Sequence, residues 1–197
     1  MKRWIVLIAT MVFFFVLIGC ADTDEMENTH QEGNEPSIET FGSLSEETTE
    51  VNVTMYNRDM EKVGTATIRQ VHDGINITLD ASNLPPGTHG FHIHEKGLCE
   101  APDFESAGGH FNPTNAKHGF EHPEGPHAGD LPNIVVKEDG TVRTEGIADM
   151  VTLIKGKKNS LLKNDGTALI IHAEADDYRS QPSGNAGDRI ACGVIGE

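Results

Sequence analysis

Lysine and arginine are scarce in this chain. It has 15 of them against 31 aspartates and glutamates, so its formal net charge is −16 at pH 7. Proteins that bind nucleic acid neutralise phosphates with clustered basic side chains. We therefore expect no nucleic-acid partner, and the acidic balance bears on solubility rather than on the fold.

A helical period is also missing, because no stretch long enough for a helix repeats its apolar residues at the helical spacing of about 3.6 residues. From Val51 onward, apolar and polar residues instead alternate over short runs, which predicts half-buried strands. These runs cover residues 51–55, 63–68, 75–79, 90–95, 133–136, 142–153, 167–172 and 189–195. We predict an all-β domain, an eight-stranded antiparallel β-sandwich or flattened barrel with two long functional loops, at 96–131 and 173–188.

The chain has no apolar run of the ~20 residues that a membrane span needs. Its longest run, Trp4–Ile18, follows Lys2 and Arg3 and fits the apolar region of a secretory signal peptide. The run ends Leu-Ile-Gly-Cys, which resembles the lipobox of bacterial lipoproteins and implies a diacyl anchor on Cys20. The alternative is an uncleaved signal anchor with Cys20 as an ordinary thiol.

This interpretation divides the chain into three parts. A signal peptide covers residues 1–19, a linker covers 20–49 and a folded domain covers 50–197. The linker is rich in acidic and small polar residues, and it has too few large apolar side chains to offset the entropy of ordering. We expect a domain that is lipid-anchored to the cell membrane and faces its extracytoplasmic side.

Cysteine is rare, with three residues in the whole chain. If Cys20 carries the anchor, Cys99 and Cys192 remain as a pair, and such a pair in an exported protein indicates a disulfide. The alternative, two thiolate metal ligands, is weaker because other side chains supply a full ligand set.

Histidine, by contrast, is concentrated in one region. Of ten histidines, seven lie between Phe91 and His172. Neutral imidazole is the commonest protein ligand for zinc and copper, and a carboxylate can complete such a shell. The spacing therefore predicts a metal site built from His92, His94, His110, His118, His127, Asp130 and His172.

Two ligand sets can be drawn from these residues. His92 and His94 project from one face of a strand, and with His110 and His172 they supply four nitrogens suited to Cu(II). The second set, with His110 counted again, gives three imidazoles and one carboxylate, a closed shell suited to a structural zinc. It consists of His110, His118, His127 and Asp130. A deprotonated His110 could bind one metal through each ring nitrogen.

Four segments resemble the copper–zinc superoxide dismutase family, and the resemblance covers about Val51 to Glu197. They are Gly90–His94, Ser106–Pro113, Gly125–Asp130 and Gly184–Gly193. The resemblance implies a Greek-key β-sandwich, the copper and zinc sets given above, and the Cys99–Cys192 disulfide. It also implies that Arg189 guides and holds the anionic substrate, and that Asp176 hydrogen-bonds one ligand of each metal.

The activity that the resemblance implies is dismutation of superoxide to dioxygen and hydrogen peroxide by a copper redox cycle. Zinc would hold the loop, and His110 would carry a proton to the product. The alternative is an extracytoplasmic copper- and zinc-binding module without significant turnover. Because the second loop has few cations, we expect weak electrostatic attraction of superoxide. Subunit contacts vary among bacterial members, so no oligomeric state is predicted.

Four histidines are left out of the ligand sets. By the resemblance His89 is structural, and His122 is expected to face solvent. His30 and His72 lie in the linker and in a turn, with no partner in view.

Overall fold

The structure is a computed structural model that describes residues 50–196. The expected signal peptide, the lipid anchor at Cys20 and the linker at 20–49 lie outside this range. Within it, no helix combines the length and the apolar character that crossing a membrane requires.

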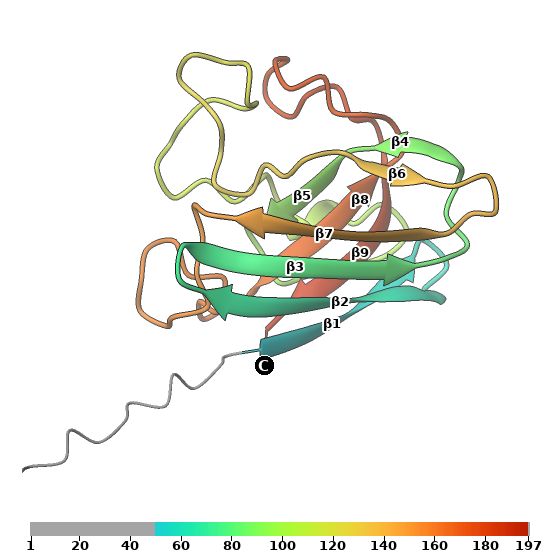
Figure 1. Cartoon of the computed structure of the whole chain (residues 1–197), viewed down its shortest axis with the longest axis horizontal. Helices are drawn as coiled ribbons and strands as arrows, with labels where there is room; N and C mark the ends of the chain where they lie inside the picture. The colour runs from blue at the N-terminus through green and yellow to red at the C-terminus, as the bar shows by residue number, and fades with distance from the viewer. Residues whose placement is uncertain (1–49, 197) are drawn as a thin grey trace, which may run out of the picture. The chain divides into compact units, whose positions relative to one another are not determined.

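The described residues form an all-β domain, as predicted, with nine strands and one turn of 3₁₀ helix (Figure 1). Seven strands make one antiparallel sheet in the order β5-β8-β9-β1-β2-β3-β7, and two short strands, β4 and β6, pair separately. Figure 1 shows the large sheet curled, with β5, β8 and β9 behind β7, β3 and β2. The elements are β1 (Glu50–Asn57), β2 (Lys62–Val71), β3 (Gly74–Ala81), β4 (Gly87–His89), β5 (Phe91–His94), η1 (Glu105–Ala107), β6 (Ile134–Val136), β7 (Val142–Ala148), β8 (Thr167–His172) and β9 (Arg189–Ile195).

The curled sheet encloses the main apolar core. Alternate residues of β2 and β3, such as Ile68 and Leu79, face residues of the opposite part of the sheet, such as Leu169 and Ile171. The period-two pattern read from the sequence is the consequence of this one-sided burial.

Strand β8 is buried on both faces. Leu169 and Ile171 belong to the main core, whereas Ala168 and Ile170 join a second, smaller cluster with Phe104 and the half-cystine Cys192. The first long loop covers this outer cluster. All six residues of β8 are therefore buried, including His172 at its end.

Most predicted strands differ from the observed ones in their bounds, and two of these differences have a local cause. The run at 90–95 begins one residue later, because the peptide of Gly90 pairs with Glu174 and His172 and ends β4 there. A Cβ at Gly90 would lie 2.9 Å from that of Ala186, so the second long loop packs directly on this break. The run at 142–153 ends as a strand at Ala148. Its last apolar residues stay buried in a turn.

Candidate metal centre

Strand β5 brings the first two predicted ligands into the site. His92 and His94 are both buried, and β5 pairs with β8 so that His94 lies opposite Ala168. The edge of β5 that is not paired with β8 receives the long loop, which approaches it twice. His94 forms an isolated bridge with His110, and His92 forms one with Asp130.

Backbone hydrogen bonds hold these two approaches. The peptide of Ile93 donates to Gly129 O and accepts from the N–H of Phe111, both at 2.8 Å. Gly129 is required at this crossing, since a Cβ there would lie 2.3 Å from the carbonyl oxygen of Ile93. The long loop is thus pinned to the strand that carries His92 and His94.

The structure brings both predicted ligand sets together. In each set the ligating atoms all lie within 4.8 Å of one another, and every residue is buried. The first set is His92, His94, His110 and His172, and the second is His110, His118, His127 and Asp130.

In the first set, hydrogen bonds fix which ring nitrogen of three histidines keeps a free lone pair. Nε2 of His92 donates to Asp176 at 2.8 Å, and Nδ1 of His94 and of His172 donate to backbone carbonyls at 2.9 and 3.2 Å. The opposite nitrogens are left for a ligand. Nε2 of His94 and Nε2 of His172 are 3.4 Å apart, and Nδ1 of His92 and Nε2 of His110 are buried without a hydrogen-bond partner among residues 50–196.

The second set has the same property. In the described part of the chain, Nδ1 of His118 and Nδ1 of His127 are buried without a hydrogen-bond partner, although they lie 3.1 and 3.3 Å from Asp130 oxygens. Nδ1 of His110 lies 2.8 Å from the same carboxylate. Buried polar atoms in proteins are rarely left unpaired. Four such nitrogens converging on two points fit two metal ions with His110 between them.

Burial keeps three imidazoles of the first set neutral, those of His94, His110 and His172. It lowers the pKa of His110 to about 4 and that of His172 to about 3, and it lowers the pKa of His94 well below its usual value. A neutral imidazole is the form that ligates a metal.

The second set is arranged for a cation. Burial opposes ionisation of Asp130, but the ring nitrogens of His110, His118 and His127 beside its carboxylate outweigh that effect and hold its pKa well below the usual range. Burial also opposes protonation of His118, yet the neighbouring carboxylates of Asp130 and Asp176 outweigh that effect and raise its pKa to about 9. Positive charge is therefore stabilised beside the Asp130 carboxylate.

Asp176 connects the two sets by hydrogen bonds to ring nitrogens that are not available to a metal. Its carboxylate accepts from Nε2 of His92 at 2.8 Å and from Nε2 of His118 at 3.0 Å. Its backbone is held in turn by Asn133, whose amide accepts from Asp176 N and donates to Asp176 O, both at 2.9 Å. Such outer groups fix the orientation of metal-binding imidazoles.

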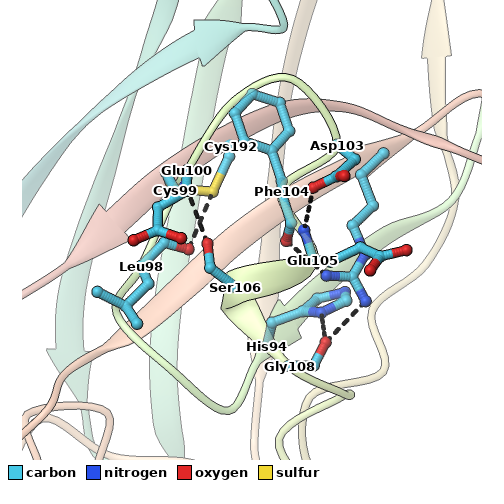
Figure 2. Close-up of a disulfide and its surroundings, with 11 residues drawn as sticks. His94, Leu98, Cys99, Glu100, Asp103, Phe104, Glu105, Ser106, Gly108 and Cys192 are labelled. Atoms are coloured by element: carbon cyan, nitrogen blue, oxygen red, sulfur yellow. Dashed lines mark hydrogen bonds between the residues drawn. A yellow bond between two sulfur atoms is a disulfide. The ribbon is translucent and has the colours of Figure 1, made fainter.

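Arg189 reaches the site from the start of β9. Its guanidinium donates to Phe104 O at 2.5 Å and to Gly108 O at 2.7 Å. Gly108 O also accepts from His94, so one carbonyl joins the cation to a ligand of the first set (Figure 2). A cavity of about 500 Å³ is lined by Arg189 together with His94, His110 and His172. An anion that enters this cavity meets the cation beside the first ligand set.

The predicted disulfide is present. Cys99 and Cys192 are bonded, with their Cα atoms 5.7 Å apart. Phe104 packs beside the disulfide in the outer apolar cluster (Figure 2) and is fully buried. Sequence reasoning missed the role of Phe104, because a backbone carbonyl that holds Arg189 has no sequence signature.

The remaining histidines of the described part of the chain lie outside both sets, and His30 lies outside the described residues. His89 is buried, and its two ring nitrogens lie 2.8 Å from His172 O and 2.8 Å from Pro85 O. His122 is half-buried in the long loop, and His72 is exposed beside Asp73. The structural role expected of His89 fits its two backbone contacts.

Comparison with known proteins agrees with this geometry. The family model for copper/zinc superoxide dismutase matches residues 62–195. The chain is 58% identical over 140 residues to "Superoxide dismutase [Cu-Zn] 1" of Aquifex aeolicus, an alignment that covers 71% of this chain and 83% of that protein.

A protein of Bacillus subtilis named as superoxide dismutase-like is 51% identical over 146 residues, covering 73% of this chain and 74% of the relative. A solved structure of a SOD-like protein from Bacillus subtilis is also similar, with a TM-score of 0.72 and 51% identity over 74% of this chain and 97% of that one. That structure is a double mutant in which a tyrosine and a proline are each replaced by histidine.

Proposed function

The chain belongs to the copper/zinc superoxide dismutase family, and on that premise we propose that it converts superoxide to dioxygen and hydrogen peroxide. The observation that carries the proposal is the set of free ring nitrogens described above. The ligating nitrogens of the first set lie within 4.8 Å of one another, and three of its histidines, His94, His110 and His172, line the cavity that also contains Arg189.

We assign copper to His92, His94, His110 and His172, and zinc to His110, His118, His127 and Asp130. The assignment follows from donor chemistry. Four imidazole nitrogens suit Cu(II), and three imidazoles with one carboxylate suit a closed zinc shell. Most of the first set lines the cavity with Arg189, so the redox metal belongs there.

Copper, when bound, supplies the one-electron chemistry by cycling between Cu(II) and Cu(I). The protein supplies the rest. Arg189, fixed by two carbonyl oxygens, binds the superoxide anion beside the copper ligands. His110 contributes Nε2, and its side chain lines the cavity, where this nitrogen can hold and deliver a proton to the product.

The test is superoxide dismutation by the full chain loaded with copper and zinc, compared with His172→Ala. His172 is a ligand only of the copper set, so the variant should lose activity and retain zinc. His122→Ala is the matched control, because His122 lies outside both sets and should leave activity unchanged. An unmodified chain that binds both metals at full occupancy yet has no activity would favour the alternative, a copper- and zinc-binding module.

We also propose that the protein is a lipoprotein held on the extracytoplasmic side of the cell membrane through Cys20. The support is the basic start, the apolar run of Trp4–Ile18 and the lipobox-like end at Cys20. Expression of the chain and of Cys20→Ala, followed by membrane fractionation and mass measurement, tests it. The chain should sediment with membranes and carry the mass of a diacyl group, and the variant should do neither.

A further inference from the structure

One side chain of the second long loop grips the backbone of a proposed zinc ligand. Oε1 of Gln181 accepts from the N–H of His118 at 3.0 Å, and Nε2 of Gln181 donates to the carbonyl oxygen of His118 at 2.9 Å. A single amide thus pairs both backbone groups of a residue that lies 63 positions away in the chain. Nε2 also donates to Arg179 O at 3.0 Å, which fixes the amide within its own loop.

His118 is completely buried, so its backbone polar groups need partners inside the protein. It lies in a loop, where no neighbouring strand can provide them. Gln181 therefore replaces the strand pairing that holds His110 and Asp130 beside β5. The backbone N–H and carbonyl groups of His118 thus depend on a side chain of the second loop for their hydrogen bonds.

Two further contacts from the same loop hold the ring of His118. Asp176 accepts from Nε2 of His118 at 3.0 Å, which leaves Nδ1 free for the metal. Gly184 packs against the same ring edge, where a Cβ would lie 2.6 Å from Nε2. The backbone and the ring of His118 are thus fixed by residues 176–184.

The residues next to Gln181 also form part of the wall of the substrate cavity. Pro182 and Ser183 directly follow Gln181 and line the cavity that contains Arg189 and His110. Holding Gln181 on His118 therefore holds this part of the cavity wall in place.

We propose that Gln181 is a positioning residue for the zinc site, clamping the backbone of His118 so that its Nδ1 is directed at the metal. The inference rests on the zinc assignment made above. Loss of the clamp frees the peptide of His118 to rotate, which moves Nδ1 off the metal and speeds zinc release. Changes to groups that orient metal ligands typically cost 10- to 100-fold in metal affinity.

A second crossing between the same loops provides a matched control. Arg179 forms an ion pair with Glu121, and the side chains of both residues are exposed. Exposed ion pairs contribute little to stability. Arg179→Gln removes a contact between the two loops without touching His118, so it should leave the zinc site unchanged.

The experiment compares the full chain, loaded with copper and zinc, with Gln181→Met, Gln181→Glu and Arg179→Gln. Methionine keeps the length of the side chain and removes its hydrogen bonds. Glutamate keeps the acceptor for His118 N but places a second oxygen against His118 O. The readouts are the rate of zinc transfer to a chromophoric chelator, the absorption spectrum with cobalt(II) in place of zinc, and the melting temperature of the metal-free protein.

We expect Gln181→Met and Gln181→Glu to release zinc about 10-fold faster or more, with altered cobalt bands. Arg179→Gln should stay within about twofold of the unmodified chain. Zinc release from Gln181→Met at the unmodified rate would overturn the clamp. The clamp would also be overturned if the metal-free variant melted at a temperature so much lower that general destabilisation explained all of its faster zinc release. Gln181 would then have a general structural role. If the unmodified chain binds no zinc, the proposed function fails instead.

Discussion

Arg189 donates a hydrogen bond of 2.5 Å to the carbonyl oxygen of Phe104. The side chain of Phe104 is fully buried in the outer apolar cluster, beside the disulfide. Phe104 also has a φ of 57°, a left-handed conformation that a bulky residue adopts only when its surroundings hold it there. Apolar packing behind the first long loop therefore sets the position of Arg189, the cation that we propose binds superoxide.

Phe104→Ala should weaken both stability and catalysis. The cavity that it leaves costs about 3–5 kcal/mol in the free energy of unfolding, and the freed carbonyl lets Arg189 move from the copper ligands. We expect kcat/KM for superoxide to fall while copper and zinc stay bound, as measured by kinetics and metal analysis. Phe104→Leu, which keeps most of the apolar volume, should fall less. Unchanged kinetics in a destabilised Phe104→Ala would contradict the coupling.

Removal of the disulfide should destabilise the same region. Cys99 and Cys192 are separated by 93 residues, and closing a loop of that size stabilises the folded state by about 4–5 kcal/mol in the chain-entropy model. The double variant Cys99→Ser, Cys192→Ser should therefore unfold at a lower denaturant concentration. Because Phe104 packs on the disulfide, kcat/KM should fall as well. A stability difference below about 1 kcal/mol would argue against the expected role.

The metal-free protein should be most stable near pH 6.5. The pKa values of His110 and His172 fall to about 4 and 3 on folding, so their contribution is complete above about pH 6.5 and is lost as the pH falls. The pKa of His118 rises to about 9, so its contribution is complete below about pH 6.5 and is lost as the pH rises through 9. Denaturant unfolding at pH 5, 6.5 and 8.5 measures this curve.

The variant His172→Asn is the control for the acid side of that curve. It removes one group that must be protonated on unfolding, so its stability should fall less between pH 6.5 and pH 5. An unmodified protein with equal stability at pH 5 and pH 6.5 would contradict the assignment of buried, neutral histidines.

Electrostatic attraction of superoxide should be weak, as the composition suggests. A groove beside Arg189 is lined by three carboxylates, those of Asp103, Glu105 and Asp188. The second cation of this groove is Arg58, which is paired with Asp188 at 3.2 Å. We expect kcat/KM to depend little on salt, because the acidic surroundings offset the cation. A rate that falls steeply with ionic strength would show that this expectation is wrong.

Glu105→Gln tests the same point by a single change of charge. It removes one negative charge near Arg189 and should raise kcat/KM at low salt by about twofold to threefold, with little effect at high salt. Glu145→Gln, on β7, is a control that removes a carboxylate outside that groove. Equal effects of the two variants would indicate a response to net charge rather than to the groove.

The fold class and the candidate ligands could be predicted from the sequence. Alternation of apolar residues follows directly from one-sided burial of a strand, so the runs at 63–68 and 75–79 lie within β2 and β3. The alternating pattern predicted the end of a strand wrongly where apolar residues stay buried beyond that end. Val151 and Leu153 are buried in a turn, where Gln70 accepts from Leu153 N at 2.7 Å, so the strand predicted over 142–153 ends early.

Which side chains can ligate a metal follows from the order of the amino acids alone. Imidazole and carboxylate groups are specified residue by residue, and their concentration between Phe91 and His172 is typical of a metal site. The orientation of those groups depends on the folded chain. Carbonyl oxygens of Phe104, Gly108 and Gly187 fix Arg189 and two histidine rings, and Gln181 fixes the peptide of His118. Every residue has a backbone carbonyl, so the sequence does not show which carbonyls accept these hydrogen bonds. That depends on how the two long loops fold onto β5 and β8.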